Sequence, residues 1–236
     1  GIQEEMDGEK VDMTTEEAQI TNSTSVMMTT VAGDEYAIGY ISLGSLDESV
    51  KALKIDGAEA TAENVKSGDY KVSRPFNIAT KKDLDNEVAK DFINYIMSAE
   101  GQKVVEDNGY IAVEGAEAFE GTQPSGKAVV GGSSSVSPVM EKLAEAYKEV
   151  NPNAEIELQT TDSTTGMTSA IDGSYDIGMA SRELKEEEIA ELDAKVIATD
   201  GIAVIVNNNN AMDELSSDQV KAIYTGEALT WDEVVE

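Results

Sequence analysis

Three short polar stretches of the sequence carry residues that can bind an anion. Residues 131–136 read GGSSSV, residues 162–166 read DSTTG, and Ser181-Arg182 follows the run DIGMA. Each stretch follows a β-rich run and precedes a helical one, where unpaired backbone N–H groups and the helix dipole favour negative charge. The hydroxyls add donors, and the glycines allow close approach. The candidate binding residues in these stretches are Ser133, Ser134, Ser135, Ser163, Thr164, Ser181 and Arg182.

Each candidate also has a purely structural interpretation. Serines before a helix can simply cap it, and Arg182 can pair with Glu183 or Glu186 instead of an oxyanion. Asp200, in the run ATDGIAVIV, is either a turn residue or a further candidate, a carboxylate that accepts a proton from a partly protonated anion. The positions favour the binding interpretation, because loops at successive strand ends meet at one edge of a parallel sheet.

Short β-rich runs alternate with helical stretches along the chain, which predicts an α/β fold with mostly parallel strands. In the second half we expect strands near 127–131, 154–159, 175–180, 194–199 and 202–207, and helices near 136–150, 164–172, 185–191 and 216–224. In the first half we expect helices near 23–32, 86–97 and 100–107, and strands near 37–42, 51–55, 70–73 and 76–80.

The chain divides into two parts around a predicted linker. Residues 114–126, EGAEAFEGTQPSG, contain three glycines and one proline and no sustained hydrophobic period. The parts on either side are residues 1–113 and 127–236. They share a weak internal echo, because residues 22–39 and 162–178 both have a polar cap, a Met-bearing helix and a strand ending in Ile-Gly. The echo is either coincidence among Ser/Thr-rich caps or two lobes that each aim a helix N-terminus at one cleft.

Composition excludes several classes of function. The chain has 236 residues, of which 47 are acidic and 17 basic, and its formal charge of −30 opposes binding to nucleic acid or anionic membranes. It has no histidine and no cysteine, so His-dependent catalytic triads and the usual thiolate and imidazole metal sites are impossible. No nucleotide-binding or calcium-loop motif is present. We expect a globular protein that is not an enzyme and needs no cofactor or metal.

Several longer stretches resemble the phosphate-binding protein of bacterial phosphate ABC transporters, in its Gram-positive form. In the second half these are GGSSSVSPVMEKLAEAY, DSTTGMTSAIDGSYDIGMASRELKEEE, ATDGIAVIVN and TGEALTWDEV; in the first half they are AIGYISLGSLDESVKALKIDG, SRPFNIATK and FINYIMSAEGQKVVEDNGYIAV. The resemblance covers nearly the whole chain. It implies a two-lobed fold of the type II periplasmic-binding-protein class, with the polar stretches facing phosphate.

The order of the two halves differs from the order that we expect for this family. Residues 127–236 resemble the family's first, N-terminal half, and residues 1–113 resemble its second half. The chain is then either cut across two tandem modules, which we favour, or circularly permuted. The two halves are expected to dock within one chain, or to swap between chains as a homodimer, into something like one complete module.

The resemblance implies a solute-binding protein that holds inorganic phosphate between its lobes and delivers it to a membrane permease. It implies an extracytoplasmic, cell-surface location, with signal and anchor outside residues 1–236. Ser181 stands where relatives have an aspartate that accepts the phosphate hydrogen, unless Asp200 or Asp162 takes that role. A Ser-Gly-Thr-Arg loop of the second lobe is expected but not found, so this chain should bind phosphate weakly or not at all. The alternatives are a binding protein for another oxyanion and a non-binding structural module.

Overall fold

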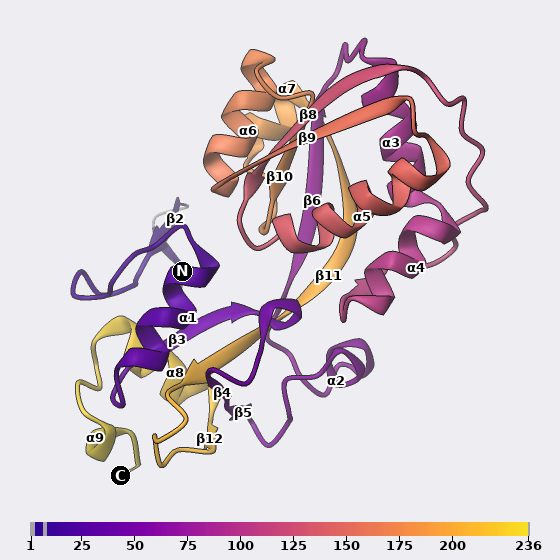
Figure 1. Cartoon of the computed structure of the whole chain (residues 1–236). Coiled ribbons are helices and arrows are strands. Elements are labelled where there is room, and N and C mark those ends of the chain that lie inside the picture. Colours follow the sequence, from indigo (N-terminus) through magenta and orange to yellow (C-terminus); the bar gives the residue numbers. More distant parts are fainter. Residues whose placement is uncertain (1–2, 7–8, 236) are drawn as a thin grey trace.

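The structure, a computed structural model, describes residues 3–6 and 9–235, and the predicted first half, residues 1–113, begins outside them. Figure 1 shows two bodies connected by two long strands, β6 (Ser73–Lys81) and β11 (Leu192–Val206). We call residues 73–200 lobe I, and residues 13–72 together with 201–235 lobe II. An N-terminal hairpin of β1 (Gln3–Met6) and β2 (Glu9–Asp12) precedes lobe II.

Lobe I is a sheet covered by helices on both faces. The strands β8 (Gly126–Ser133), β9 (Ala154–Thr161) and β10 (Ile177–Ala180) are parallel, and the short β7 (Ile111–Ala112) pairs with β11. The helices are α3 (Glu87–Met97), α4 (Ala99–Asp107), α5 (Ser137–Val150), α6 (Ser163–Asp172) and α7 (Glu186–Glu191). Helices α3, α4 and α5 pack on one face, whereas Met167 and Ala170 of α6 pack with Ala79, Ala180 and Leu192 on the other.

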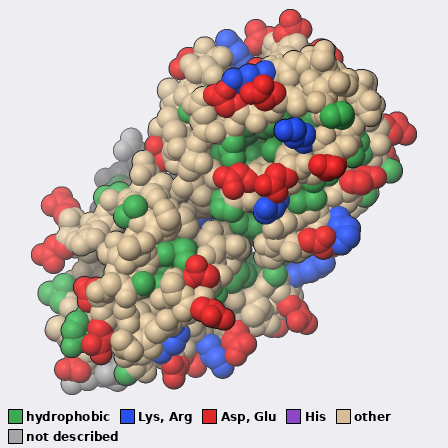
Figure 2. All heavy atoms as spheres, in the orientation of Figure 1, with side chains coloured by type: hydrophobic (Ala, Val, Ile, Leu, Met, Phe, Trp, Pro, Cys, Tyr) green, Lys and Arg blue, Asp and Glu red, His purple; other side chains and the backbone are tan. Residues whose placement is uncertain are grey.

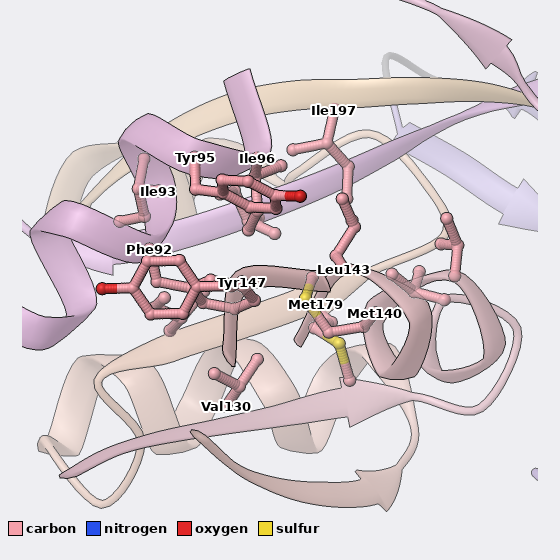
Figure 3. Packing of buried hydrophobic residues seen from close by; sticks show 14 of the residues in the cluster. Phe92, Ile93, Tyr95, Ile96, Val130, Met140, Leu143, Tyr147, Met179 and Ile197 are labelled. Atoms are coloured by element: carbon pink, nitrogen blue, oxygen red, sulfur yellow. The ribbon is translucent and has the colours of Figure 1, made fainter. Parts of the chain in front are cut away.

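The largest hydrophobic core holds α3, α4 and α5 against this sheet. In Figure 3, Phe92 and Tyr147 lie with Leu143 and Met179 between the helices and the strands. The ring centroids of Phe92 and Tyr147 are 5.0 Å apart, and both side chains are almost completely buried. Because this core is close-packed, it holds the loops at the strand ends of lobe I in fixed positions.

Lobe II is smaller and is built around the last part of β11. There β11 pairs with β3 (Ile38–Ser42) and β4 (Lys51–Ala52). Around them lie α1 (Thr24–Gly33), the 3-10 turn η1 (Leu43–Ser45), α2 (Ala62–Ser67), α8 (Ser217–Thr225) and α9 (Trp231–Val235), with the parallel pair β5 (Lys54–Ile55) and β12 (Glu214–Leu215). Its cores are separate from that of lobe I.

The α/β class and the expected helices are confirmed, but the expected strands need four corrections. The predicted strand 51–55 is two short strands, β4 and β5, which pair with β11 and β12 in different sheets. The predicted strands 194–199 and 202–207 form the single strand β11, because β11 passes from pairing with β6 at Gly201 to pairing with β3 at Ile202 without a turn. The predicted strands 70–73 and 76–80 are replaced by β6, which starts at Ser73. Because β6 and β11 run antiparallel to their neighbours, the pairing is mixed and not mostly parallel.

The two sequence halves dock within the one chain. Strand β6 of the first half lies between β10 and β11 of the second half, so neither half completes the sheet alone. The predicted linker 114–126 does not separate two bodies either. It packs on lobe I, where Thr122 donates its backbone N–H to buried Asp91 at 2.7 Å and the Phe119 ring contacts Tyr95. The boundaries between the lobes lie at residues 73 and 201.

Candidate functional site

The three polar stretches meet at one edge of lobe I, as predicted. In the parallel register Ser133 at the end of β8 stands beside Thr161 at the end of β9, and Met179 of β10 stands beside Gly132. Helices α5 and α6 begin directly after β8 and β9. This edge therefore presents two helix N-termini and the end of a third strand side by side.

Three of the predicted serines form a compact hydroxyl cluster. Ser133 Oγ donates to Ser181 Oγ at 2.9 Å, and Ser163 Oγ lies 3.5 Å from the same oxygen. Ser163 Oγ also accepts the backbone N–H of Ser181 at 3.1 Å. Residues far apart in sequence thus bring neutral donors to one place, where they can turn toward the oxygens of an anion.

The remaining hydroxyl residues surround this cluster. Ser135 donates its backbone N–H to Ser133 Oγ at 3.3 Å, and Ser134 Oγ lies 3.4 Å from Thr24 Oγ1 at the start of α1. Ser134 and Ser135 are half-buried. Because Thr24 belongs to lobe II, the start of α1 meets the turn between β8 and α5, where the two lobes come together. Both helices of the internal echo, α1 and α6, are present. That they aim at one cleft stays a prediction.

Two glycines allow the helix and strands to approach so closely at this edge. A Cβ on Gly132 would lie 2.3 Å from the carbonyl oxygen of Met179, and a Cβ on Gly166 would lie 2.7 Å from the same atom and 2.8 Å from Gly132 Cα. Gly132 also has a φ of +139°, which L residues rarely adopt. Because neither glycine has a Cβ, the first turn of α6 can lie directly on β8 and β10.

Asp162 is the N-cap of α6. Its carboxylate accepts the backbone N–H of Thr165 at 2.9 Å and the Thr165 hydroxyl at 2.7 Å. These hydrogen bonds, the backbone one first, hold the pKa of Asp162 below its ordinary value. The side chain thus carries a negative charge that occupies part of the helix terminus.

Arg182 lies at the rim of the cluster and is paired with a carboxylate. Its two terminal nitrogens donate to Glu188 at 2.7 and 2.8 Å, and one of them lies 3.5 Å from Thr164 Oγ1. The structural alternative named Glu183 or Glu186 as partner; Glu188 takes that place, and Glu183 contributes only its backbone oxygen. Burial alone would raise the pKa of Glu188, but the hydrogen bonds from Arg182 and the Lys185 N–H outweigh it and lower the pKa.

Asp200 lies at the junction of the lobes, and its hydrogen-bond partners are not the serines of the cluster. Its carboxylate accepts from Ser42 Oγ at 2.7 Å and from Arg74 Nε at 3.1 Å, and the residue is fully buried. Burial raises the pKa of Asp200 to about 6, although the charge of Arg74 and the hydrogen bonds oppose this. The structure therefore gives this carboxylate partners on β3 and β6, the strands that flank the point where β11 enters lobe II.

Three polar residues near the cluster were not among the predicted site residues. Thr24 contacts Ser134, Asn77 of β6 donates to the backbone oxygen of Arg182 at 2.9 Å, and Thr160 Oγ1 lies 2.8 Å from Ser137 Oγ. The internal echo pointed to the region of Thr24. Asn77 gave no local signal, since it is one polar residue inside a strand.

Two further observations concern metal sites and membrane-spanning helices. Within residues 3–6 and 9–235, no group of three or more Asp, Glu, His or Cys side chains is arranged to hold a metal ion. No helix in this part of the chain is long and apolar enough to span a membrane.

Comparison with known proteins agrees with this architecture. The family described as PBP superfamily domain matches residues 3–100 and 117–235. A phosphate-binding protein PstS 2 of Streptococcus agalactiae serotype V is 58% identical over 228 residues, which is 96% of this chain and 78% of that protein. A phosphate-binding protein PstS 2 of Streptococcus pneumoniae serotype 4 is 45% identical over 236 residues, 99% of this chain and 80% of that protein.

A solved structure gives the same result. The crystal structure of a phosphate-binding protein of a phosphate ABC transporter from Streptococcus pneumoniae TIGR4 matches with a TM-score of 0.74 and 44% identity, covering 97% of this chain and 90% of that chain.

These alignments also bear on the order of the halves. Each runs through nearly the whole chain, so these relatives carry the two halves in the same order as this chain. A tandem origin and a circular permutation stay predictions. The relatives are named as binding proteins and not as enzymes, which confirms that expectation. The chain belongs to the PBP superfamily and, within it, to the family of PstS phosphate-binding proteins.

Proposed function

We propose that this chain binds inorganic phosphate between its two lobes and serves a phosphate ABC transporter. The observation that carries the proposal is the cluster of Ser133, Ser163 and Ser181, which unites three strand ends at two helix N-termini. Hydroxyls and backbone N–H groups in this arrangement can donate to several oxygens of one tetrahedral anion. The names of the relatives supply the identity of that anion.

Ser134, Ser135 and Thr164 complete the proposed set of hydroxyl donors. Arg182 lies next to Thr164 and adds a cation at the rim. Asp200 lies at the junction of the lobes, where it pairs with Arg74. Local donors are sufficient to hold an anion on a chain of formal charge −30, because charges more than a Debye length away, about 10 Å at 0.1 M salt, are screened. Figure 2 shows acidic side chains spread over both lobes on the face in view.

The proposal includes a partner and a location. The permease of the ABC transporter is the membrane partner, and the protein acts outside the cytoplasm at the cell surface. A domain-swapped homodimer remains a prediction; the docking of both halves within one chain means that the fold does not require it.

We expect residues 1–236 to bind phosphate weakly. Hydrogen bonds to a charged group contribute about 1.5–3 kcal/mol each, so a site that lacks several second-lobe donors loses orders of magnitude in affinity. Isothermal titration with phosphate measures this directly. Tight binding by residues 1–236 would contradict the prediction of weak binding and would leave phosphate binding itself supported.

Ser181→Ala should weaken phosphate binding about tenfold, because the Ser181 hydroxyl is the oxygen that both Ser133 and Ser163 contact. Phosphate-dependent chemical shifts at millimolar phosphate measure the change. Ser174→Ala is the matched control, since Ser174 is exposed and lies beyond the other end of α6. Equal affinities for the two variants would place the anion elsewhere.

A second candidate is a binding protein for another oxyanion. The observation that favours it is Ser181, whose hydroxyl can donate to any oxyanion. A carboxylate at the position of Ser181 would instead repel an anion that carries no proton. A competition panel of phosphate, sulfate and molybdate distinguishes the candidates. Preference for sulfate or molybdate would favour this second function, and no binding of any of the three would favour a structural module.

A further inference from the structure

All four N–H groups on the terminal nitrogens of Arg182 are already engaged within the protein. One nitrogen donates to the Glu183 backbone oxygen at 3.0 Å and to one oxygen of Glu188, and the other donates to the second oxygen of Glu188 and faces Thr164 Oγ1. A guanidinium has only one further N–H, on Nε. Arg182 therefore cannot offer its two-pronged face to an anion while Glu188 holds it.

Glu188 is built into the fold as the partner of this arginine. Its side chain is 7% exposed, and it also accepts the backbone N–H of Lys185 at 2.8 Å. The neighbouring acidic residues of α7, Glu186 and Glu187, are exposed. One carboxylate of α7 thus points inward at the rim of the site, while its neighbours point to solvent.

A carboxylate and a phosphate bind a guanidinium in the same way, through two parallel N–H···O hydrogen bonds. The hydrogen bond from Arg182 to Thr164 places the guanidinium at the first turn of α6, next to the hydroxyl cluster. An anion at the cluster and Glu188 are therefore alternative partners for the same two nitrogens. Asp162, the cap of α6, adds a second negative charge nearby, so this side of the site carries one cation and two carboxylates.

We propose that Glu188 competes with the bound anion for Arg182 and thereby limits the affinity of the site. This inference rests on the proposed function. Glu188 acts as a positioning residue, because it reaches the anion only through Arg182. The arginine is paired with Glu188 in the structure, and anion binding exchanges that partner for an oxygen of the anion.

Glu188→Gln should tighten phosphate binding about tenfold, the gain expected from one charge-assisted hydrogen bond that no longer competes with an internal carboxylate. Glu186→Gln is the control, since it removes the same charge from an exposed position on the same helix. Adding Arg182→Gln to Glu188→Gln should abolish the gain. A gain that persists without Arg182, or that Glu186→Gln reproduces, would show a general charge effect and overturn the competition.

A measurement on the unmodified chain covers the case in which Glu188→Gln does not fold. The side-chain N–H signals of Arg182 in nitrogen-15 NMR should move as phosphate is titrated, because the terminal nitrogens change partner. Phosphate binding seen at other residues without movement of these signals would overturn the inference and leave the proposed function intact. No binding at all would overturn both.

Discussion

Gly166→Ala should destabilise the protein by about 3 kcal/mol and eliminate phosphate binding. The new Cβ would lie 2.7 Å from the Met179 carbonyl oxygen and 2.8 Å from Gly132 Cα. Both are backbone atoms of strands in the sheet, so neither can move away as the end of a side chain would. Helix α6 must shift outward, and this separates Ser163 from Ser181, whose contacts form the cluster.

Urea unfolding and a phosphate titration of the same variant measure both effects. Gly33→Ala is the control, because the space around Gly33 at the end of α1 is open and its Cβ would meet nothing within 4 Å. It should stay within about 0.5 kcal/mol of the unmodified protein. A Gly166→Ala variant that keeps its stability and its phosphate affinity would show that the close packing of α6 does not position the site.

Asp200→Asn should remove a pH-dependent loss of stability. Burial raises the pKa of Asp200 from 3.8 to about 6, so between these values the folded protein holds a proton that the unfolded chain has released. The free energy of unfolding therefore falls as the pH rises through this window. The shift corresponds to roughly 3 kcal/mol, at 1.36 kcal/mol per pKa unit.

Asparagine cannot ionise, so the difference in stability between the variant and the unmodified protein should change by about this amount in favour of the variant between pH 4 and pH 7. The ionisable groups that face Asp200 are Arg74 and Tyr110. Burial raises the pKa of Tyr110 to about 12, so its phenol stays neutral over this range. Urea unfolding of both proteins at several pH values tests the expectation, and parallel stability curves would contradict it.

Much of the architecture was predictable because its signals are local. The α/β class, the helices and the three polar stretches at strand ends follow from hydrophobic period, capping residues and glycines, each of which acts within a few positions along the chain. The proximity of Ser133, Ser163 and Ser181 could therefore be predicted from their place in the alternation of strands and helices. The order of strands across the sheet has no such local signal.

The partners of the charged residues were not predictable in the same way. The structural interpretation paired Arg182 with Glu183 or Glu186, but which nearby carboxylate turns inward depends on how α7 packs against the sheet. Asp200 was interpreted as a turn residue or a proton acceptor. Its partners Ser42 and Arg74 are 158 and 126 positions away in sequence, and β11 meets β3 and β6 only in the folded chain.

The helices, the hydroxyl loops, the absence of histidine and cysteine chemistry, and the resemblance to a family all follow from the amino-acid sequence. Three features emerge only in the folded chain: β6 completes the sheet of the other half, Thr24 of lobe II meets Ser134 of lobe I, and Glu188 holds Arg182. Capping and periodicity are properties of neighbouring residues, whereas strand order and ion pairing are chosen by the burial of surfaces that are distant in sequence.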